Sequence, residues 1–231
     1  MSIPSSLSSF ISSFNISSAL SILISPRKIF CGIDFGLTPA CVFAQRIRNR
    51  WVVFDELVAE DMGIVKFSDL MKQVMAQYLP REFVIFGDPA GDHRVQTDES
   101  TPFQIMRGKG IYARPAPSND VTLRLESVSS VLNRMVDGES GIIIDNKCNN
   151  LIKGFAGGYH YRRLQVSGER YDEKPNKNRF SHVHDALQYL LLGAGEGRAL
   201  TIGKKTNKPV VAKRNFNVFD VKPKSVYERR R

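Results

Sequence analysis

Three aspartates that lie beside apolar segments are the residues of this chain best suited to chemistry. Asp34 follows IFCGI, Asp88 follows FVIFG, and Asp185 lies within HVHDALQYLLLG. Placing a carboxylate against a hydrophobic core is costly unless a cation meets it. Clustered carboxylates bind divalent ions such as Mg²⁺. The pattern therefore predicts that folding brings the three acids together around bound divalent cations.

Each aspartate also has an ordinary structural explanation. Asp34 could form a turn, Asp88 could accept amide N–H groups of the Pro-Ala-Gly turn, and Asp185 could be favoured by the dipole at a helix N-terminus. Taken singly, these explanations are as good as a metal site. Three such coincidences in one chain are less economical than one shared site, so the shared site is preferred.

Hydrophobic periodicity in the first part of the chain predicts the elements that would position Asp34 and Asp88. Three adjacent β-rich segments predict an antiparallel meander over Lys28–Gly36, Pro39–Ile47 and Asn49–Leu57. A helical spacing of apolar residues from Phe67 to Tyr78 follows, and Pro80 ends it before a strand at Glu82–Gly87. A right-handed crossover would make that strand a parallel neighbour of the first. Asp34 and Asp88 would then share one rim of the sheet.

The second part of the chain predicts alternating elements that end on Asp185. We expect a strand at Ile111–Ala113, a helix capped by Asn119 or Asp120 and ended by Gly138, a strand at Gly141–Asp145, a helix around Asn149–Phe155, a polar hairpin at Tyr159–Arg179 and a helix at Val183–Leu192. The order β-β-β-α-β-α-β-α predicts an α/β domain with a mixed sheet. Asp185 completes the cluster if the last helix packs across the rim.

Composition and charge divide the 231 residues into three parts. Residues 1–27 form a serine-rich leader, with eleven serines and no charge in residues 1–26 and no run of membrane-spanning length. Residues 28–195 form one domain, and residues 196–231 form a basic arm that we expect to be disordered. The arm carries +8 of the formal charge of +10, which is typical of polyanion contact, although a solubilising tail is the alternative. Cys31, Cys41 and Cys148 lack metal-site spacing and are expected to be buried thiols without a disulfide or structural zinc.

The ordered motifs resemble one family. GIDFGLTPACVF, FVIFGDPAGDHR, GKGIYARPAPSNDVTLRLESVSSVL, IIIDNKCNNLIKGFAGGYHY and SHVHDALQYLLLG are similar, in this order and spacing, to the nuclease domain of the large terminase subunit of tailed phages. That domain has an RNase H-like (RuvC-like) fold: a mixed sheet of three antiparallel strands plus parallel strands, flanked by helices. The resemblance covers about residues 29–195, and its specificity comes from the order of all five motifs and not from any single one.

The resemblance implies an endonuclease that cuts concatemeric double-stranded viral DNA. It implies two divalent cations, Mg²⁺ or Mn²⁺, with Asp34 bridging both ions and with Asp88 and Asp185 holding one each. Implied partners are a packaging ATPase, the small terminase subunit and the portal, in the cytoplasm of a bacterial host and without a membrane. In-line phosphodiester hydrolysis needs an activated water and charge relief at the leaving oxygen, which two metal ions supply.

Further residues are candidates for supporting roles. Asp145 follows Ile-Ile-Ile and could be a fourth acid, but a helix cap near Asn149 is favoured. His182 lies three residues before Asp185, on the same helical face, where it could orient a phosphate or a water or only bond locally. Candidate DNA-binding residues lie on the polar hairpin and on the arm: Arg162, Arg163, Arg170, Lys174, Lys177, Arg179, Lys204, Lys205, Lys213 and Arg214. Acidic neighbours leave a merely solvated hairpin as the alternative.

Other protein classes remain as alternatives. A complete packaging terminase also contains an ATPase motor, whose phosphate loop would read GxxxxGK[ST]. The nearest string, GRALTIGKK at residues 197–205, has the wrong glycine spacing and a Lys at the Ser/Thr position. GIDFGLT also resembles the phosphate-binding opening of actin-like ATPases and sugar kinases, which need a second similar half. A RuvC-like junction resolvase or transposase nuclease would share the acidic trio, and a catalytically inactive DNA-binding remnant would rely on the basic arm.

Overall fold

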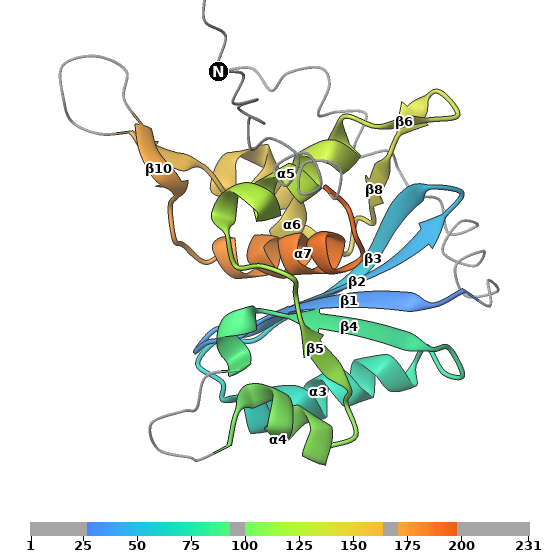
Figure 1. Cartoon of the computed structure of the whole chain (residues 1–231), viewed down its shortest axis with the longest axis vertical. Coiled ribbons are helices and arrows are strands. Elements are labelled where there is room, and N and C mark those ends of the chain that lie inside the picture. The colour runs from blue at the N-terminus through green and yellow to red at the C-terminus, as the bar shows by residue number, and fades with distance from the viewer. Residues whose placement is uncertain (1–26, 93–99, 164–170, 198–231) are drawn as a thin grey trace, which may run out of the picture. The chain divides into compact units, whose positions relative to one another are not determined.

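The computed structural model describes residues 27–92, 100–163 and 171–197, which form a mixed six-stranded sheet flanked by helices (Figure 1). Strands β1 (Ile29–Asp34), β2 (Ala40–Ile47) and β3 (Arg50–Val58) form the antiparallel meander. Helix α3 (Ile64–Ala76) then leads to β4 (Phe83–Gly87), which pairs with β1 in parallel. The predicted α/β class, meander and crossover are confirmed.

Two short parallel strands complete the sheet at its edges. Strand β5 (Ala113–Pro115) pairs with β4, and β8 (Ile142–Ile144) pairs with β3. The resulting order is β5-β4-β1-β2-β3-β8. Strand β1 therefore lies inside the sheet, and its parallel neighbour β4 ends at the same rim. This arrangement places Asp34, at the end of β1, next to Asp88, which directly follows β4.

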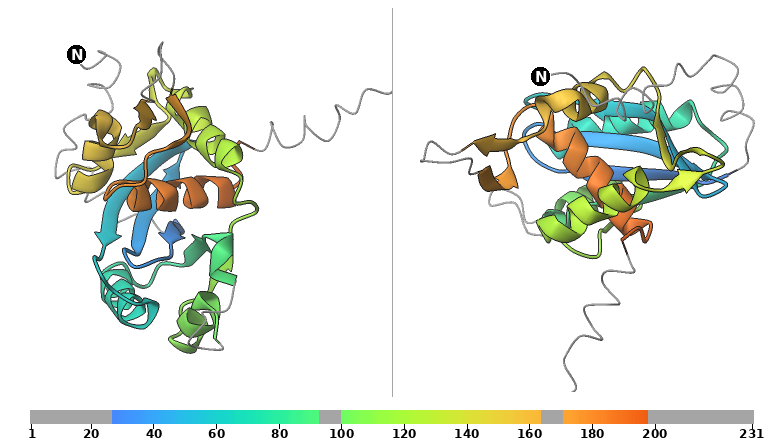
Figure 2. Two further views of the ribbon diagram at one scale, coloured as in Figure 1. Left: turned by 90° about the vertical axis from the view of Figure 1, so that its left-hand side faces the viewer. Right: turned by 90° about the horizontal axis from the view of Figure 1, so that it is seen from above.

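The helices lie in two layers on opposite faces of the sheet (Figures 1 and 2). Helices α3 and α4 (Pro102–Gly108) pack on one face, where Cys31 and Ile33 of β1 join their core. Helices α5 (Val121–Leu132), α6 (Asn149–Lys153) and α7 (Ser181–Gly193) pack on the other. Because side chains alternate along a strand, Gly32 and Asp34 share the face opposite Cys31 and Ile33. That face is the one covered by α7.

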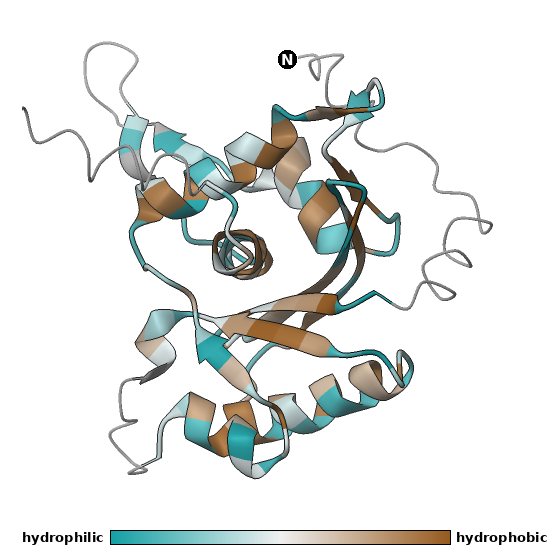
Figure 3. Cartoon of the chain, turned by 45° about the vertical axis from the view of Figure 1, so that its right-hand side comes forward, coloured by the Kyte–Doolittle hydropathy of each residue, from teal (hydrophilic) through white to brown (hydrophobic). Residues whose placement is uncertain are grey.

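Helix α7 is the central helix of its layer, and almost all of its residues are buried. Figure 3 shows it nearly end-on between the sheet and the helices above it, with most of its ribbon coloured as hydrophobic. A helix that is apolar on most sides belongs inside a core. Its approach to β1 is close because Gly32 has no side chain: a Cβ there would lie 2.0 Å from the carbonyl oxygen of Ala186.

The structure differs from the sequence prediction between residues 100 and 140. Helix α4 was not predicted, although Thr101 and Gln104 form a complete capping box at its start. Helix α5 ends at Leu132, and the residues beyond it form a two-stranded ribbon of β6 (Met135–Val136) and β7 (Glu139–Ser140). The prediction that Gly138 ends the helix was wrong. Asp137 and Gly138 instead form the turn of the ribbon, with φ angles of 52° and 78°.

The predicted hairpin and the predicted buried thiols are present in the fold. The polar hairpin consists of β9 (Tyr161–Arg163) and β10 (Tyr171–Pro175), and a π-helical turn, η2 (Gly154–Gly158), extends α6. The three cysteines are buried and free, as expected of small apolar residues. None of the helices in the described residues is long and apolar enough to cross a membrane. The serine-rich leader and nearly all of the basic arm lie outside the described residues.

Candidate active site

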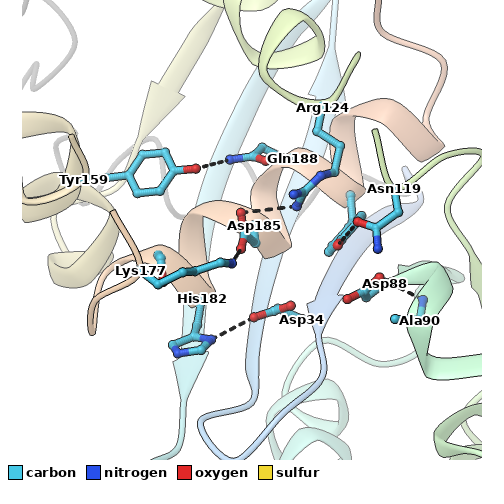
Figure 4. Close-up of polar contacts among 12 residues, drawn as sticks. Asp34, Asp88, Ala90, Asn119, Arg124, Tyr159, Lys177, His182, Asp185 and Gln188 are labelled. Carbon is cyan, nitrogen blue, oxygen red and sulfur yellow. Dashed lines mark hydrogen bonds and ion pairs between the residues drawn. The ribbon is translucent and has the colours of Figure 1, made fainter. Parts of the chain in front are cut away.

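Asp34 and Asp88 occupy matching positions at the ends of adjacent parallel strands. Ile33 of β1 aligns with Gly87 of β4, and the amide of Asp88 donates a hydrogen bond to the carbonyl of Ile33 at 3.0 Å. The turn η1 (Pro89–Asp92) follows at once, and Asp88 Oδ1 accepts a 2.9 Å hydrogen bond from the amide of Ala90. The turn-acceptor explanation of Asp88 is therefore correct, and it coexists with a side chain that faces the site (Figure 4).

Asp185 reaches the same place from α7. It lies next to Ala186, whose carbonyl contacts the backbone of β1 at Gly32, two residues before Asp34. Burial raises the pKa of Asp34, the hydrogen bond from His182 opposes that rise, and the negative charge of Asp185 adds to it. Two of the three acids thus interact electrostatically within a buried region. The sequence prediction that folding gathers the trio on one rim describes the arrangement in Figure 4.

His182 contacts the trio directly. Its Nδ1 lies 2.9 Å from Oδ2 of Asp34, one helical turn before the point where α7 meets Gly32. When Asp34 is ionised it can only accept a hydrogen bond, and Nδ1 of His182 is then the donor. The contact fixes one oxygen of Asp34. Of the two roles considered for His182, the structure shows a local bond that orients an acid of the site.

Two basic side chains contact Asp185, and neither contact was anticipated. Nη1 of Arg124, from α5, lies 3.2 Å from Asp185 Oδ1. Nζ of Lys177, from the segment before α7, forms an ion pair with Oδ2. Lys177 was expected to be a DNA-binding residue, and in this structure it binds a carboxylate of the trio. Arg124 could have been noticed as a charged residue among the apolar residues of its helix, on the face that is buried.

Tyr189 and Asn119 form the wall of the site beside Asp88. The Tyr189 hydroxyl donates a 2.8 Å hydrogen bond to Oδ1 of Asn119, and the Arg124 guanidinium lies over the Tyr189 ring at 4.8 Å. Burial raises the pKa of Tyr189 well above its usual value, and the nearby charges of Asp88 and Asp34 act in the same direction. Tyr189 is therefore a neutral hydrogen-bond donor at neutral pH.

The oxygen ligands that the three aspartates offer are of the type that divalent cations bind. Carboxylate oxygens are the ligands that Mg²⁺ and Mn²⁺ take, and no Lys or Arg within the described ranges forms an ion pair with Asp34 or Asp88. No group of three or more His, Cys, Asp and Glu side chains in the part of the chain that the structure describes is arranged around a single ion. Mg²⁺ is usually held by one or two carboxylates, with water and substrate oxygens as its other ligands. Asp185, in contrast, already has two cationic partners.

Asp145 lies away from the trio. It follows β8, which β2 and β3 separate from β1, and its Oδ1 accepts the amide of Lys147 at 2.9 Å. It does not cap α6 either, so the cap that the sequence favoured is wrong. Glu56 of β3 does so instead: its carboxylate accepts the amides of Asn150 and Leu151 at 2.7 and 3.0 Å.

The candidate DNA-binding residues are only partly described. Arg162 is exposed and pairs with Asp172 at 3.6 Å, and Arg179 is exposed and lies over the Phe180 ring. An open depression of about 430 Å³ on the hairpin is lined by His160, Tyr161 and Tyr171. It is not the site of the acids. The other basic candidates lie outside the described residues or have undescribed side chains: Arg163, Arg170, Lys174, Lys204, Lys205, Lys213 and Arg214.

The fold is similar to solved structures of bacteriophage large terminases. The large terminase of a thermophilic bacteriophage matches with a TM-score of 0.55 and 18% identity, over 71% of this chain and 39% of that one. The nuclease domain of the large terminase g2p of bacteriophage SPP1, solved with bound Mn, matches with a TM-score of 0.51 and 17% identity, over 78% of this chain and 92% of that one. No protein-family model and no curated protein matches the chain.

These matches show the fold. The chain has the RNase H-like α/β fold of large terminase nuclease domains, as its motifs indicated. It spans about two-fifths of the length of the large terminase from the thermophilic phage and nearly all of the SPP1 nuclease domain.

Proposed function

We propose that this chain is a metal-dependent endonuclease that cleaves double-stranded DNA. The observation that carries the proposal is the register of Asp34 and Asp88 at the ends of adjacent parallel strands, faced by Asp185 from α7. The fold shared with large terminase nuclease domains supports it. The Mn bound in the SPP1 domain supports divalent-cation chemistry for an acidic site on this fold.

Each side chain of the site has a role in this proposal. Divalent cations bound here supply charge relief at the phosphodiester and a more acidic water for in-line attack. Asp34, at the end of the inner strand β1, would hold the cations together with Asp88 and Asp185. His182 orients Asp34 through Oδ2, and the amide of Ala90 orients Asp88 through Oδ1. These contacts fix the carboxylates before a substrate arrives.

The decisive experiment is cleavage of a supercoiled plasmid with Mg²⁺, with Mn²⁺ and with EDTA. Asp88→Asn keeps the shape of the side chain and removes its charge, so it should reduce cleavage to the level of the metal-free reaction without unfolding the chain. Asp34→Asn and Asp185→Asn should do the same. Retention of cleavage by any of the three removes that residue from the proposed site.

Asp137→Asn is a matched control for this experiment. Asp137 is exposed in the β6–β7 turn, and Asn tolerates its left-handed backbone equally well. The variant has the same change of charge and atom count as Asp88→Asn. It should cleave at the wild-type rate.

We propose that the basic hairpin and arm bind the phosphates of DNA without reading its bases. Replacing Lys204, Lys205, Lys213 and Arg214 by Gln in the full chain should weaken binding to all sequences alike. The slope of log K against log salt should also decrease by about 0.9 for each phosphate that the arm no longer neutralises. An unchanged slope contradicts a role of the arm in binding phosphates.

The biological setting is a further part of the proposal. A terminase nuclease cuts concatemeric viral DNA during packaging, in the cytoplasm of a bacterial host, together with an ATPase, a small terminase subunit and a portal. If this chain has that role, the ATPase comes from outside these 231 residues, since the phosphate-loop motif is absent from them. Cleavage of linear duplex DNA without preference for branched junctions would favour this role over that of a junction resolvase or transposase.

One observation favours a second candidate function, that of a DNA-binding protein without catalysis. The two oxygens of Asp185 each contact a cation, Arg124 or Lys177, so a metal ion would have to compete with these two side chains for the third acid. Under this alternative, the wild type binds DNA and no divalent ion produces cleavage. The plasmid experiment separates the two candidates directly.

A further inference from the structure

The three acids of the site differ in their polar partners. Asp34 accepts a hydrogen bond from His182, and Asp88 accepts one from a backbone amide. Among the described residues, only Asp185 of the trio pairs with Lys or Arg, one at each oxygen: Arg124 at Oδ1 and Lys177 at Oδ2. The Asp185 side chain is only 3% exposed, so both contacts act where water screens charge poorly. The two proposed metal positions are therefore unequal before any ion arrives.

The two cations at Asp185 also differ in mobility. The Arg124 side chain is 7% exposed and lies over the Tyr189 ring. Its Nε and Nη1 atoms are buried without a hydrogen-bond partner in the described part of the chain, so Asp185 is the anion that compensates its charge. Moving this guanidinium would require opening the contact between α5 and α7. Lys177, in contrast, is 69% exposed, and its flexible stem can carry the ammonium group into water.

We propose that Lys177 is an exchangeable counter-ion of Asp185, which must leave before a divalent cation can bind there. Arg124 stays in place and keeps the charge at this position partly neutralised. The chain free of DNA then binds one divalent cation well, at Asp34 and Asp88, and a second one weakly, at Asp34 and Asp185. This inference rests on the proposed function, because it divides the same site into a strong and a weak metal position.

The test is direct binding of Mn²⁺ to the full chain without DNA, measured from the electron paramagnetic resonance signal of free Mn²⁺. The wild type should show one strong and one weak site. Lys177→Met replaces the apolar stem with one of similar length and removes the charged end group, so it should strengthen the weak site by about three- to tenfold. The strong site should change less than the weak one, because Lys177 forms its ion pair with Asp185 and acts on Asp34 only through the field of its charge.

Arg179→Met is a matched control, since it removes the same charge two residues further along the chain. Arg179 is exposed and stacks on Phe180 instead of contacting an acid of the trio. Its Mn²⁺ binding should equal that of the wild type. An equal change in both variants would mean that only the net charge matters and would overturn the proposal.

Two further outcomes are decisive. Two sites of equal strength in the wild type, or Lys177→Met indistinguishable from the wild type, would overturn the counter-ion role while leaving the nuclease proposal intact. A wild type that binds no Mn²⁺ and does not cleave DNA would instead refute the proposed function itself. Thermal unfolding of each variant in EDTA verifies that the binding data come from folded chains.

Discussion

The close contact between β1 and α7 is what brings Asp185 to Asp34, and Gly32→Ala tests it. A Cβ at residue 32 would lie 2.0 Å from the carbonyl oxygen of Ala186 and 2.7 and 2.8 Å from Cβ and the amide nitrogen of Leu190. Two of these three atoms belong to the helix backbone, so no side-chain rotation relieves the overlap. Either α7 or β1 must move.

The expected cost follows from the geometry. Overpacking a core costs about 1–3 kcal/mol, and a clash with backbone atoms belongs at the upper end, at about 3 kcal/mol. For a chain of this length, each kcal/mol lowers Tm by about 2–4 °C, so Gly32→Ala should unfold about 6–12 °C below the wild type. A displaced α7 also carries Asp185 away from Asp34. The affinity for Mn²⁺ should therefore decrease together with Tm.

Thermal unfolding followed by circular dichroism gives the first quantity, and Mn²⁺ binding gives the second. Gly108→Ala is the matched control: Gly108 ends α4, no atom lies within 4 Å of a Cβ built there, and its φ is not in the left-handed region. That substitution should leave Tm unchanged or raise it, since Ala is favoured over Gly in a helix by up to about 1 kcal/mol. If Gly32→Ala melts within about 2 °C of the wild type and keeps its Mn²⁺ affinity, α7 does not lie on β1 as described.

Three further predictions concern buried charge. Burial lowers the pKa of His184 from 6.5 to about 4, so the imidazole is neutral in the folded state at neutral pH. The free energy of unfolding should therefore fall by up to about 3 kcal/mol as the pH drops from 6.5 towards 4. His184→Leu should reduce this pH dependence in urea titrations. Burial opposes ionisation of Glu196, but hydrogen bonds from Arg134 and Trp51 lower its pKa overall. Glu196→Gln should therefore cost about 1–3 kcal/mol at pH 7, and the difference from the wild type should shrink as the pH falls below about 4.5. Glu56→Gln removes one of the two acceptor oxygens at the start of α6 and should cost about 1 kcal/mol, with faster hydrogen exchange in the first turn of that helix; unchanged exchange would contradict the cap.

Much of the fold followed from local pattern and general rules of chain topology. The meander was predicted from three β-rich segments joined by short turns, and the β1–β4 pairing from the right-handed crossover rule. Helix α4 was missed because its seven residues are too few for a periodic signal, even though Thr101 marks its start. Helix α5 was predicted too long because Met135 continues the helical spacing of apolar residues. In the fold, Met135 lies 67% exposed in the β6–β7 ribbon.

A β-bulge shows why other features could not be predicted. The β2–β3 register shifts after Phe43, which pairs with Asp55, while Ala44 pairs with Val53. The extra residue reverses the alternation along β3 and turns Glu56 towards α6. Without the bulge, strict alternation of side chains from Val53 onwards would place Glu56 on the face of the sheet that points away from α6. The helix cap that the sequence assigned to Asp145 therefore belongs to an acid nearly a hundred residues earlier.

The sequence by itself determined that acids would lie at the rim of the sheet, because carboxylates that directly follow apolar strands lie at strand ends, and it predicts that cations meet them there. It also determined that Asp34 and Asp88 would be neighbours, since parallel strands joined by one crossover end at the same edge. Only the tertiary structure decided the charge balance of the site. Arg124 and Lys177 meet Asp185 through the packing of α5 against α7 and the path of the chain into α7, and no local pattern encodes which distant cation a buried acid will meet.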